Sequence, residues 1–215
     1  MDLEVVPGIV PSILATLGPQ DSVFCEHGIM LYKEPQVRVD RKNTAGGGFL
    51  KTMERNTVGG IPYFLTEFVG PGHVAFSRDG VGELRVLELA VNEEIDVADG
   101  SLVCAENTLR YDMSYIKGTN RPGRMIGLWM DRLIGPGKLA IHGYGNIISM
   151  TLAPREVVLC DFGALFYKSG TVQTRTLNIP FGGGLLGKLE SFEALELIGP
   201  GKVALQSVDP KQPHY

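Results

Sequence analysis

The sequence has few of the residues that mark disulfide-stabilised, zinc-binding or nucleic-acid-binding proteins. It holds three cysteines, an odd number, and no CxxC pair, so neither a disulfide framework nor a zinc knuckle is expected. Cys25, Cys104 and Cys160 are interpreted as small buried hydrophobes. The formal net charge is −4 at pH 7, whereas binding nucleic acid by neutralising its phosphates needs a basic surplus. No nucleic-acid partner is therefore expected.

Long apolar segments and a basic N-terminal leader are missing as well. The chain begins MDLEVV, which is acidic where a secretion signal or a mitochondrial transit sequence is basic. The uncharged run 5–20 contains Pro7, Pro11 and Pro19, and prolines at this density argue against a membrane-spanning helix. We expect a cytoplasmic protein that associates with membranes only through partners.

The motifs of common enzyme classes are incomplete. The segment GGGLLGKL ends in Leu189, where a P-loop has the serine or threonine that holds magnesium. The four histidines have neither H-x-H nor H-E-x-x-H spacing, so a metal site is not expected. Cys25 and His27 share one face of a predicted strand, but the repeat described below puts Val97 in the column of Cys25, which marks a core position. We therefore assign no catalytic residue, metal ligand or cofactor.

Glycine is abundant, with 28 residues, and part of it lies in an octet that occurs three times. The octets read VGPGHVAF from Val69, IGPGKLAI from Ile134 and IGPGKVAL from Ile198. Proline followed by glycine predicts a tight reversal in which the glycine takes positive φ. Each octet is therefore predicted to be a turn that leads into a half-buried strand, with positive φ at three glycines: Gly72, Gly137 and Gly201.

A second repeated element shows that the chain is an internal triplicate. Three blocks of 21 residues, 17–37, 89–109 and 152–172, align without a gap. Each begins with leucine, has an acid at its fifth place (Asp21, Glu93, Glu156) and has a glycine at its twelfth. Apolar residues alternate ahead of this glycine, with the period of a half-buried strand. A second apolar run follows the glycine and predicts a second strand.

The order of blocks and octets predicts how the fold closes. The first block has no octet ahead of it, and the third octet follows the last block. We therefore expect the C-terminal strand, 198–205, to complete the first repeat in space, which leaves few free strand edges. The prediction is an all-β single domain over 1–215, with repeats at about 1–60, 61–126 and 127–207 around a pseudo-threefold axis. One or two short helices are expected, at 48–56 and at 184–195, although the mixed periodicity of the second segment also fits a strand.

The triplicate also suggests a binding site. Three basic positions are equivalent in the octets, and acids are equivalent in the blocks. If the basic residues face the axis together, they would bind a phosphate or a carboxylate; the alternative is that each is a solvated residue beside a turn. The candidate ligand-binding residues are His73, Lys138 and Lys202. Separately, Arg121 and Arg124 lie near Tyr115 and Trp129 in a linker, a combination that can bind single-stranded nucleic acid or form only a loop.

Three segments give the chain a family resemblance: YFLTEFVGPGHVAF, LIGPGKLAIHGYG and the closing LIGPGKVALQS. Together with the block pattern and the GGGF segment, they resemble the altered-inheritance-of-mitochondria family over nearly the whole chain. The resemblance implies a β fold like that of the tryptophan-sensing RNA-binding attenuation proteins, built by internal duplication. It implies no reaction and no catalytic residue. The association of a mitochondrial relative with inner-membrane organisation points to scaffolding.

Taken together, these features favour a non-enzymatic interaction or scaffold protein. Its expected partners are other copies of itself, in a homo-oligomer, and proteins not identified by the sequence. The alternative is a module that binds a small anionic ligand through the basic set, with RNA binding less favoured. A third interpretation is an enzyme without a recognisable motif. An apolar surface patch would favour the scaffold, and a closed pocket with converging polar groups would favour the ligand binder.

Overall fold

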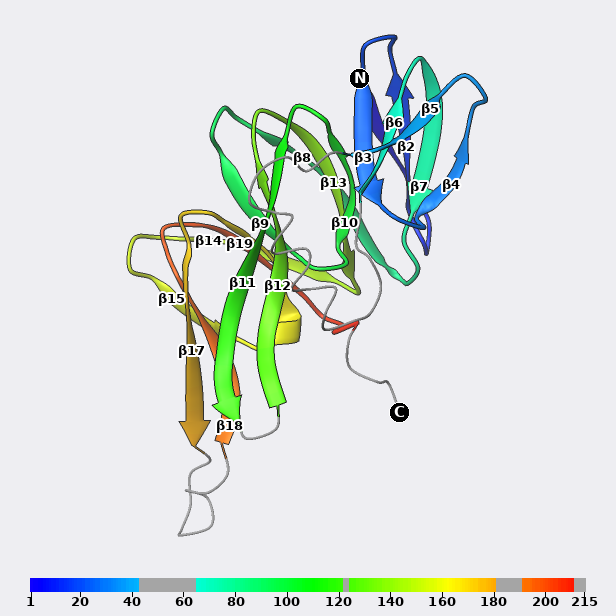
Figure 1. Ribbon diagram of the computed structural model, residues 1–215. Coiled ribbons are helices and arrows are strands. Elements are labelled where there is room, and N and C mark those ends of the chain that lie inside the picture. Colours follow the sequence, from blue (N-terminus) through cyan, green and yellow to red (C-terminus); the bar gives the residue numbers. More distant parts are fainter. Residues whose placement is uncertain (43–64, 122–123, 181–190, 211–215) are drawn as a thin grey trace.

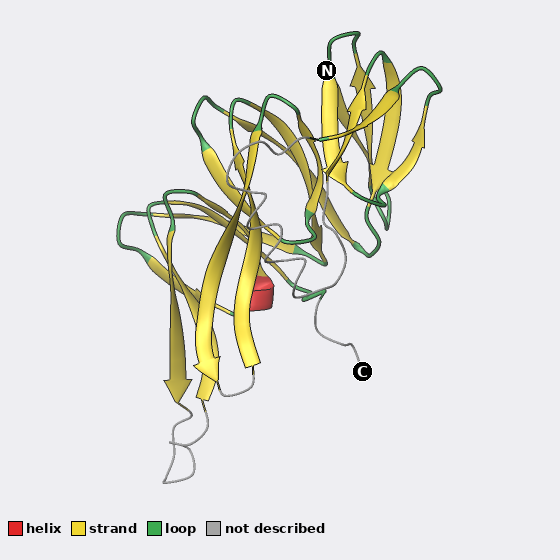
Figure 2. Ribbon diagram, in the orientation of Figure 1, coloured by secondary structure: helices red, strands yellow, loops and turns green. Residues whose placement is uncertain are grey.

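The computed structural model describes residues 1–42, 65–121, 124–180 and 191–210 (Figure 1). Within them the fold is built from antiparallel strands, and the one helical element is a 3-10 turn, η1 (Phe162–Ala164; Figure 2). The all-β prediction is confirmed. The helix expected at 48–56 lies outside the described residues, as do 184–190 of the second expected helix. The remainder of that segment is part of a strand that begins at Ser191.

The strands fall into three successive groups after the N-terminal strand β1 (Asp2–Val6). The first group is β2 (Ser12–Leu17), β3 (Ser22–Glu26), β4 (Met30–Lys33), β5 (Arg38–Arg41), β6 (Leu65–Val69) and β7 (Gly72–Ser77). The second is β8 (Gly82–Leu89), β9 (Glu94–Ala98), β10 (Leu102–Glu106), β11 (Arg110–Arg121), β12 (Arg124–Ile134) and β13 (Gly137–Tyr144). The third is β14 (Ile147–Leu152), β15 (Val157–Cys160), β16 (Leu165–Ser169), β17 (Gln173–Pro180), β18 (Ser191–Ile198) and β19 (Gly201–Gln206).

These strands form four sheets that cut across the three groups. Sheet A has the order β1-β2-β7-β4, and sheet B has β5-β6-β3-β10-β13-β8. Sheet C has β11-β12-β9-β16-β19-β14, and sheet D has β15-β18-β17. Each group therefore places three strands in one sheet and three in the next.

One pairing pattern occurs in all three groups, which we call units 1, 2 and 3 (12–77, 82–144 and 147–206). The first strand of a unit pairs with its sixth, as in β2–β7, β8–β13 and β14–β19. The second strand pairs with the fifth, as in β3–β6, β9–β12 and β15–β18. The pairing thus divides the chain near residues 80 and 145, whereas the sequence placed the divisions near 60 and 126.

Successive units are joined by one strand pair at each junction. The third strand of unit 2, β10, pairs antiparallel with β3 of unit 1, and Ala105 lies opposite Phe24. The third strand of unit 3, β16, pairs antiparallel with β9 of unit 2, and Lys168 lies opposite Asp96. The six-stranded sheets B and C are each completed in this way.

The C-terminal strand does not complete the first repeat as the sequence predicted. Strand β19 lies between β14 and β16, both from unit 3. Both of its edges are therefore occupied, and it has no edge left for a strand of unit 1. Among the described strands the units form an open row, with sheets A and D at opposite ends of the molecule (Figure 1). The expected closure around a threefold axis is not found in this pairing.

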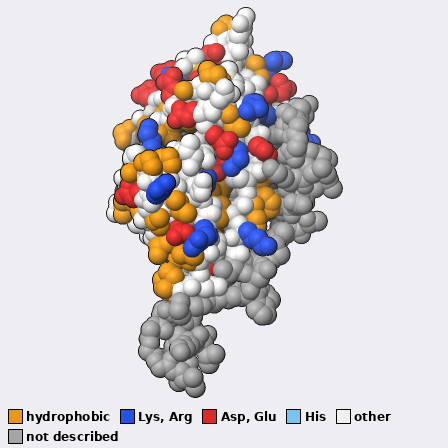
Figure 3. Space-filling model, turned by 90° about the vertical axis from the view of Figure 1, so that its left-hand side faces the viewer, with side chains coloured by type: hydrophobic (Ala, Val, Ile, Leu, Met, Phe, Trp, Pro, Cys, Tyr) orange, Lys and Arg blue, Asp and Glu red, His pale blue; other side chains and the backbone are white. Residues whose placement is uncertain are grey.

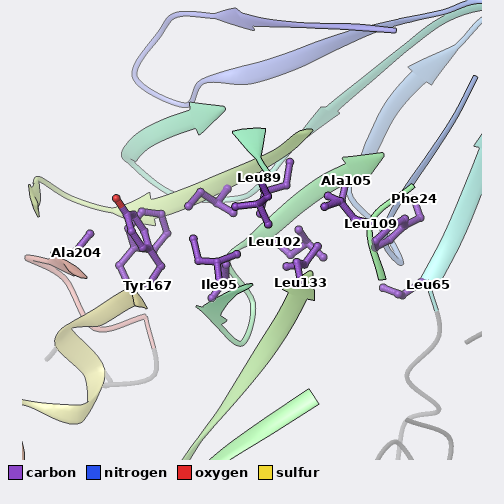
Figure 4. Packing of buried hydrophobic residues seen from close by; sticks show 14 residues of the cluster. Phe24, Leu65, Leu89, Ile95, Leu102, Ala105, Leu109, Leu133, Tyr167 and Ala204 are labelled. Carbon is purple, nitrogen blue, oxygen red and sulfur yellow. The ribbon is translucent and has the colours of Figure 1, made fainter. Parts of the chain in front are cut away.

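The core consists of three apolar clusters, each between two successive sheets. One lies between sheets A and B, one between B and C and one between C and D. The central cluster draws side chains from units 1, 2 and 3 (Figure 4), including Phe24, Leu65, Leu89, Ile95, Leu102, Leu133, Tyr167 and Ala204. Alternation along each strand turns one set of side chains into these layers.

The three GPG octets form the same turn between the fifth and sixth strands of each unit. As predicted, the glycine after each proline has positive φ: 134° at Gly72, 146° at Gly137 and 143° at Gly201. The glycine before each proline packs against a backbone carbonyl of the turn that leads into the unit's second strand. At Gly135, for instance, a Cβ would collide with the carbonyl oxygen of Ala90. The first glycine of the motif is therefore required by the close backbone contact, and the second by its positive φ.

Candidate functional site

The structure places the three basic candidates in three different sheets. His73, Lys138 and Lys202 are each the second residue of the sixth strand of a unit, in sheets A, B and C. The backbone N–H of each is bound within its own unit, by Glu34 Oε2 at 2.9 Å, by Glu106 Oε2 at 2.9 Å and by Ser169 Oγ at 3.1 Å. Among the contacts of the described residues, none joins one of these three side chains to another.

The equivalent acids cap turns. In each unit the carboxylate at the fifth place of the block accepts a hydrogen bond from a backbone N–H three residues earlier. The distances are 2.8 Å for Asp21 to Gly18, 2.8 Å for Glu93 to Ala90 and 2.7 Å for Glu156 to Ala153. The hydrogen bond from Gly18 is the main reason that the pKa of Asp21 is lowered. The basic and acidic sets thus recur because the same local turns recur.

A buried polar cluster lies where units 1 and 2 meet, and no pattern in the sequence pointed to it. Arg78, just after β7, donates to Glu26 of β3 and to the carbonyl oxygen of Leu102 on β10. Glu26, Asp99 and Asp131 each offer a carboxylate oxygen, and the three atoms lie within 4.8 Å of one another. The equivalents of Arg78 in units 2 and 3 are not basic, so the repeat gave no signal for it.

The charge balance of this cluster favours a structural role. Burial lowers the pKa of Arg78, but the nearby charges of Glu26, Tyr144 and Asp131 outweigh it, so the pKa is raised. Arg78 therefore stays cationic, and its single positive charge lies beside the three carboxylates. Tyr111 Oη also donates to Asp131 Oδ1 at 2.6 Å. This arrangement ties sheet A to sheet B through charge-assisted hydrogen bonds.

His142 lies beside this cluster and is fully buried on β13. Within the part of the chain that the structure describes, neither ring nitrogen has a hydrogen-bond partner, and the ring packs edge-on against Tyr144 at 4.8 Å between centroids. Burial and the charge of Arg78 lower the pKa of His142. The imidazole is therefore held neutral.

The junction between units 2 and 3 has an ion-paired cluster of its own. Arg132 binds Asp96 through two nitrogens, at 2.7 and 3.0 Å. Lys168 Nζ lies 2.7 Å from the second oxygen of Asp96. Burial raises the pKa of Asp96, but the hydrogen bonds and charges of Arg132 and Lys168 lower it by more than burial raises it. The pKa of Asp96 is therefore below its usual value. The charges neutralise one another across the joined strands.

A pocket of about 470 Å³ opens on unit 1 and includes the Cys25–His27 pair considered from the sequence. Its walls come from β3, β4, β5 and β6, with Met30, Val39 and Phe68 among the lining residues. Cys25 itself is almost fully buried, and burial raises the pKa of its thiol to about 12. A thiol nucleophile needs a thiolate near neutral pH, so Cys25 fits the core position that the repeat predicted.

Two strand edges with exposed apolar side chains lie at the two ends of the row. Strand β4 ends sheet A and strand β15 ends sheet D, each with one side unpaired among the described strands. Leu31 and Tyr32 on β4 are 59% and 50% exposed, and Leu159 on β15 is 48% exposed. The equivalent third strands of units 2 and 3 have side chains that are 0% exposed, at Val103 and Phe166. Figure 3, which looks onto the side that carries sheet D, shows apolar side chains gathered on this surface.

The architecture and its motifs agree with one known family over almost the whole chain. The profile of the family described as "Mitochondrial biogenesis AIM24" matches residues 9–208. The chain belongs to the AIM24 family. This confirms the resemblance seen in its motifs. Among the described residues of this AIM24-family protein, no helix has the length and apolar character needed to cross a membrane.

A solved structure shares the AIM24-family fold described above. Protein SPYM3_0169 from Streptococcus pyogenes superposes with a TM-score of 0.72 at 20% sequence identity. The match covers 97% of this chain and 94% of that chain. Comparison with curated proteins gave no match. At this identity the likeness establishes the fold alone.

Proposed function

We propose that this AIM24-family protein is a non-enzymatic scaffold that binds other protein chains through the free edges of β4 and β15. The observation that carries the proposal is the exposure of apolar side chains along both edges. An unpaired strand presents a row of backbone donors and acceptors, which are a template for pairing with another chain. Sheet edges that natural proteins protect carry charges or prolines, whereas Leu31, Tyr32 and Leu159 are apolar or aromatic.

The placement of the buried charged groups also supports a structural role. At the two junctions, buried carboxylates bind basic side chains. Glu26 binds Arg78, which also donates to the carbonyl oxygen of Leu102 in unit 2, and Asp96 of unit 2 binds Lys168 of unit 3. These contacts hold the units together. An acid–base catalyst needs a titratable group in reach of a substrate, and these groups are engaged within the fold.

The proposal is tested by photo-crosslinking in cells of the native host. A photoreactive phenylalanine analogue replaces Leu31, Leu159 or, as the control, Val91, which is 71% exposed in the turn between β8 and β9. We expect protein adducts from Leu31 and Leu159 and a background level from Val91. If both edge positions give no more adduct than Val91, the edges are not binding surfaces and the proposed function is wrong.

A further inference from the structure

The two free edges are complementary to each other. We propose that the β4 edge of one copy of this chain pairs antiparallel with the β15 edge of a second copy, so that the copies join head to tail. This inference rests on the proposed function, because it takes the edges as binding surfaces and names what binds them. Lys33 of one copy lies opposite Leu159 of the next.

The two junctions inside the chain follow one rule, and β4 and β15 are the two described strands that this rule leaves without a partner. At each junction the third strand of a unit pairs antiparallel with the second strand of the preceding unit, as β10 does with β3 and β16 with β9. Strand β4 is the third strand of unit 1, and the described residues hold no unit before it that could supply a second strand. Strand β15 is the second strand of unit 3, and the described residues hold no unit after it that could supply a third strand.

The internal registers also predict the register of the new joint. In the block alignment, Phe24, Asp96 and Leu159 are equivalent, and so are Lys33, Ala105 and Lys168. Both internal junctions pair these two positions: Ala105 with Phe24 and Lys168 with Asp96. The same rule pairs Lys33 with Leu159. It also places Tyr32 opposite Cys160, because Tyr167 lies opposite Val97 at the second junction.

Joining the edges completes a sheet of the kind already present twice. Sheets B and C each consist of three strands from one unit and three from the next. Sheets A and D are the two separated halves of such a sheet, with β1 added at one end. A β4–β15 pair gives the order β17-β18-β15-β4-β7-β2-β1, which reproduces β5-β6-β3-β10-β13-β8 of sheet B and extends it by one strand.

Side-chain exposure agrees with this assignment. Along β10 the residues Leu102, Val103 and Cys104 are completely buried, whereas Met30, Leu31 and Tyr32 at the equivalent positions of β4 are 43 to 59% exposed. On β15, Leu159 is exposed where its equivalent Phe24 is buried. Covering both strands would bury apolar surface, which favours association. The four-carbon stem of Lys33 can lie along Leu159 with its ammonium group at the surface.

The partner must be a second chain, because the two edges of one chain lie at opposite ends of the row (Figure 1). Two different surfaces form the contact, so the interface is heterologous. Heterologous contacts continue into a ring when the rotation between copies closes, and into a filament when it does not. Either assembly contains the same β4–β15 joint.

The test uses cysteine cross-linking of full-length chains in a Cys160→Ala background. One variant carries Lys33→Cys and another carries Leu159→Cys. Residues directly opposite in an antiparallel pair have Cα atoms about 4.5–5.5 Å apart, within the range that a disulfide spans. Under mild oxidation we expect a disulfide-linked dimer only when the two variants are mixed, and neither variant alone should link to itself. With both cysteines in one chain, a series of linked multimers is expected.

The controls separate the proposed joint from other contacts. Mixing Lys33→Cys with Val157→Cys, which is two residues out of register, should give at least fivefold less dimer. The proposal is overturned by equal yields in the two mixtures, by no dimer in the matched mixture, or by a dimer from Leu159→Cys alone. If the variant with both cysteines forms only an intramolecular disulfide, the two edges pair within one chain, and the proposal is overturned.

The mass in solution gives a second and independent readout. Light scattering should give wild-type protein the molar mass of a multimer of the 23.3 kDa chain. Leu159→Lys and Leu31→Lys should each reduce this molar mass to that of the single chain. Val91→Lys is the matched control and should remain multimeric. Circular dichroism checks that each variant is folded. If wild-type protein is a single chain while cellular adducts at the edges persist with other proteins, this pairing is wrong and the scaffold function stands.

Discussion

The glycine after the proline in each octet turn is required by its backbone and by its neighbours. At Gly137, φ is +146°, and a Cβ would lie 2.5 Å from Thr108 Oγ1. We expect Gly137→Val to lower the free energy of unfolding by at least ~1–3 kcal/mol, the range for a residue held in an unfavourable backbone region, and the steric contact adds to this. Thermal and urea unfolding measure the change.

A glycine without these constraints provides the comparison. The nearest atom to a Cβ at Gly8 is the Val10 carbonyl oxygen at 3.7 Å, an ordinary contact. Gly8→Val should therefore change the unfolding midpoint little. Equal losses for Gly8→Val and Gly137→Val would show that the turn has no special requirement.

The buried, neutral His142 predicts a loss of stability in mild acid. Its pKa in the folded protein is lowered from 6.5, so as the pH falls through this value the unfolded chain binds a proton before the folded chain does. The stability that this group contributes is present above pH 6.5 and falls below it. His142→Gln places there the residue that unit 3 has at the equivalent position, Gln206. Between pH 7.5 and 5, the free energy of unfolding measured with urea should fall less steeply for this variant than for wild type.

This comparison isolates one histidine from the others. His27, His73 and His214 are unchanged in the variant, so their contribution to the pH dependence cancels. Parallel pH profiles for the two proteins would contradict a lowered pKa at His142.

At the scale of strands, the joint between β9 and β16 depends on a buried charge balance. Asp96→Asn would leave Lys168, which is 5% exposed, without its carboxylate. Breaking a buried ion pair from one side costs about 3–5 kcal/mol, and we expect a loss of this size in the free energy of unfolding. The exposed carboxylate of Glu88 on β8 offers the control, since Glu88→Gln should shift the urea midpoint very little.

The other internal joint shows that apolar residues can fill these positions. Phe24 and Ala105 occupy there the places of Asp96 and Lys168. The double variant Asp96→Phe with Lys168→Ala should therefore be more stable than Asp96→Phe alone, in which the lysine keeps its charge without a partner. If the double variant is the less stable of the two, the ion pair is not what fixes this joint.

The strands and turns of the fold could be predicted from the sequence to a large extent, because they depend on local patterns. Alternating apolar residues before and after Gly28, Gly100 and Gly163 correspond to pairs of strands in units 1, 2 and 3. The octets gave the turns and their positive φ. The segment near Ser191 was harder, since its apolar spacing fits a helix or a strand and the sheet partners β15 and β17 decide the outcome.

At the scale of the whole molecule, the sequence did not reveal which units touch. The leftover third octet suggested closure onto the first repeat, but β19 has partners on both sides within unit 3. Strand pairing depends on distant residues, and equivalence in sequence does not specify nearness in space. For the same reason the basic set was expected at a common axis, whereas its members are equivalent residues of three separate sheets.

The open row also predicts where backbone protection depends on assembly. In the head-to-tail assembly the outward amide groups of β4 and β15 are hydrogen-bonded, and in a single chain they face solvent. Hydrogen exchange in these two strands should therefore be at least tenfold faster in Leu159→Lys than in wild type, with the interior strands β10 and β16 unchanged. Similar exchange in β4 for both proteins would mean that this edge is not covered by a second copy.

Each junction pairs a strand of one unit with a strand of the next unit, which is synthesised later. Strand β3 pairs with β10, which follows it about 80 residues later. A ribosome that adds about 5–20 residues per second therefore completes β10 roughly 4–16 s after β3. Strand β9 likewise remains without this neighbour until β16 is synthesised. Throughout translation the most recently made unit has half of a sheet without a partner. Strand β15 has a neighbour on one side only among the described strands, so in the proposed assembly the strand that covers its other side comes from a separately synthesised copy.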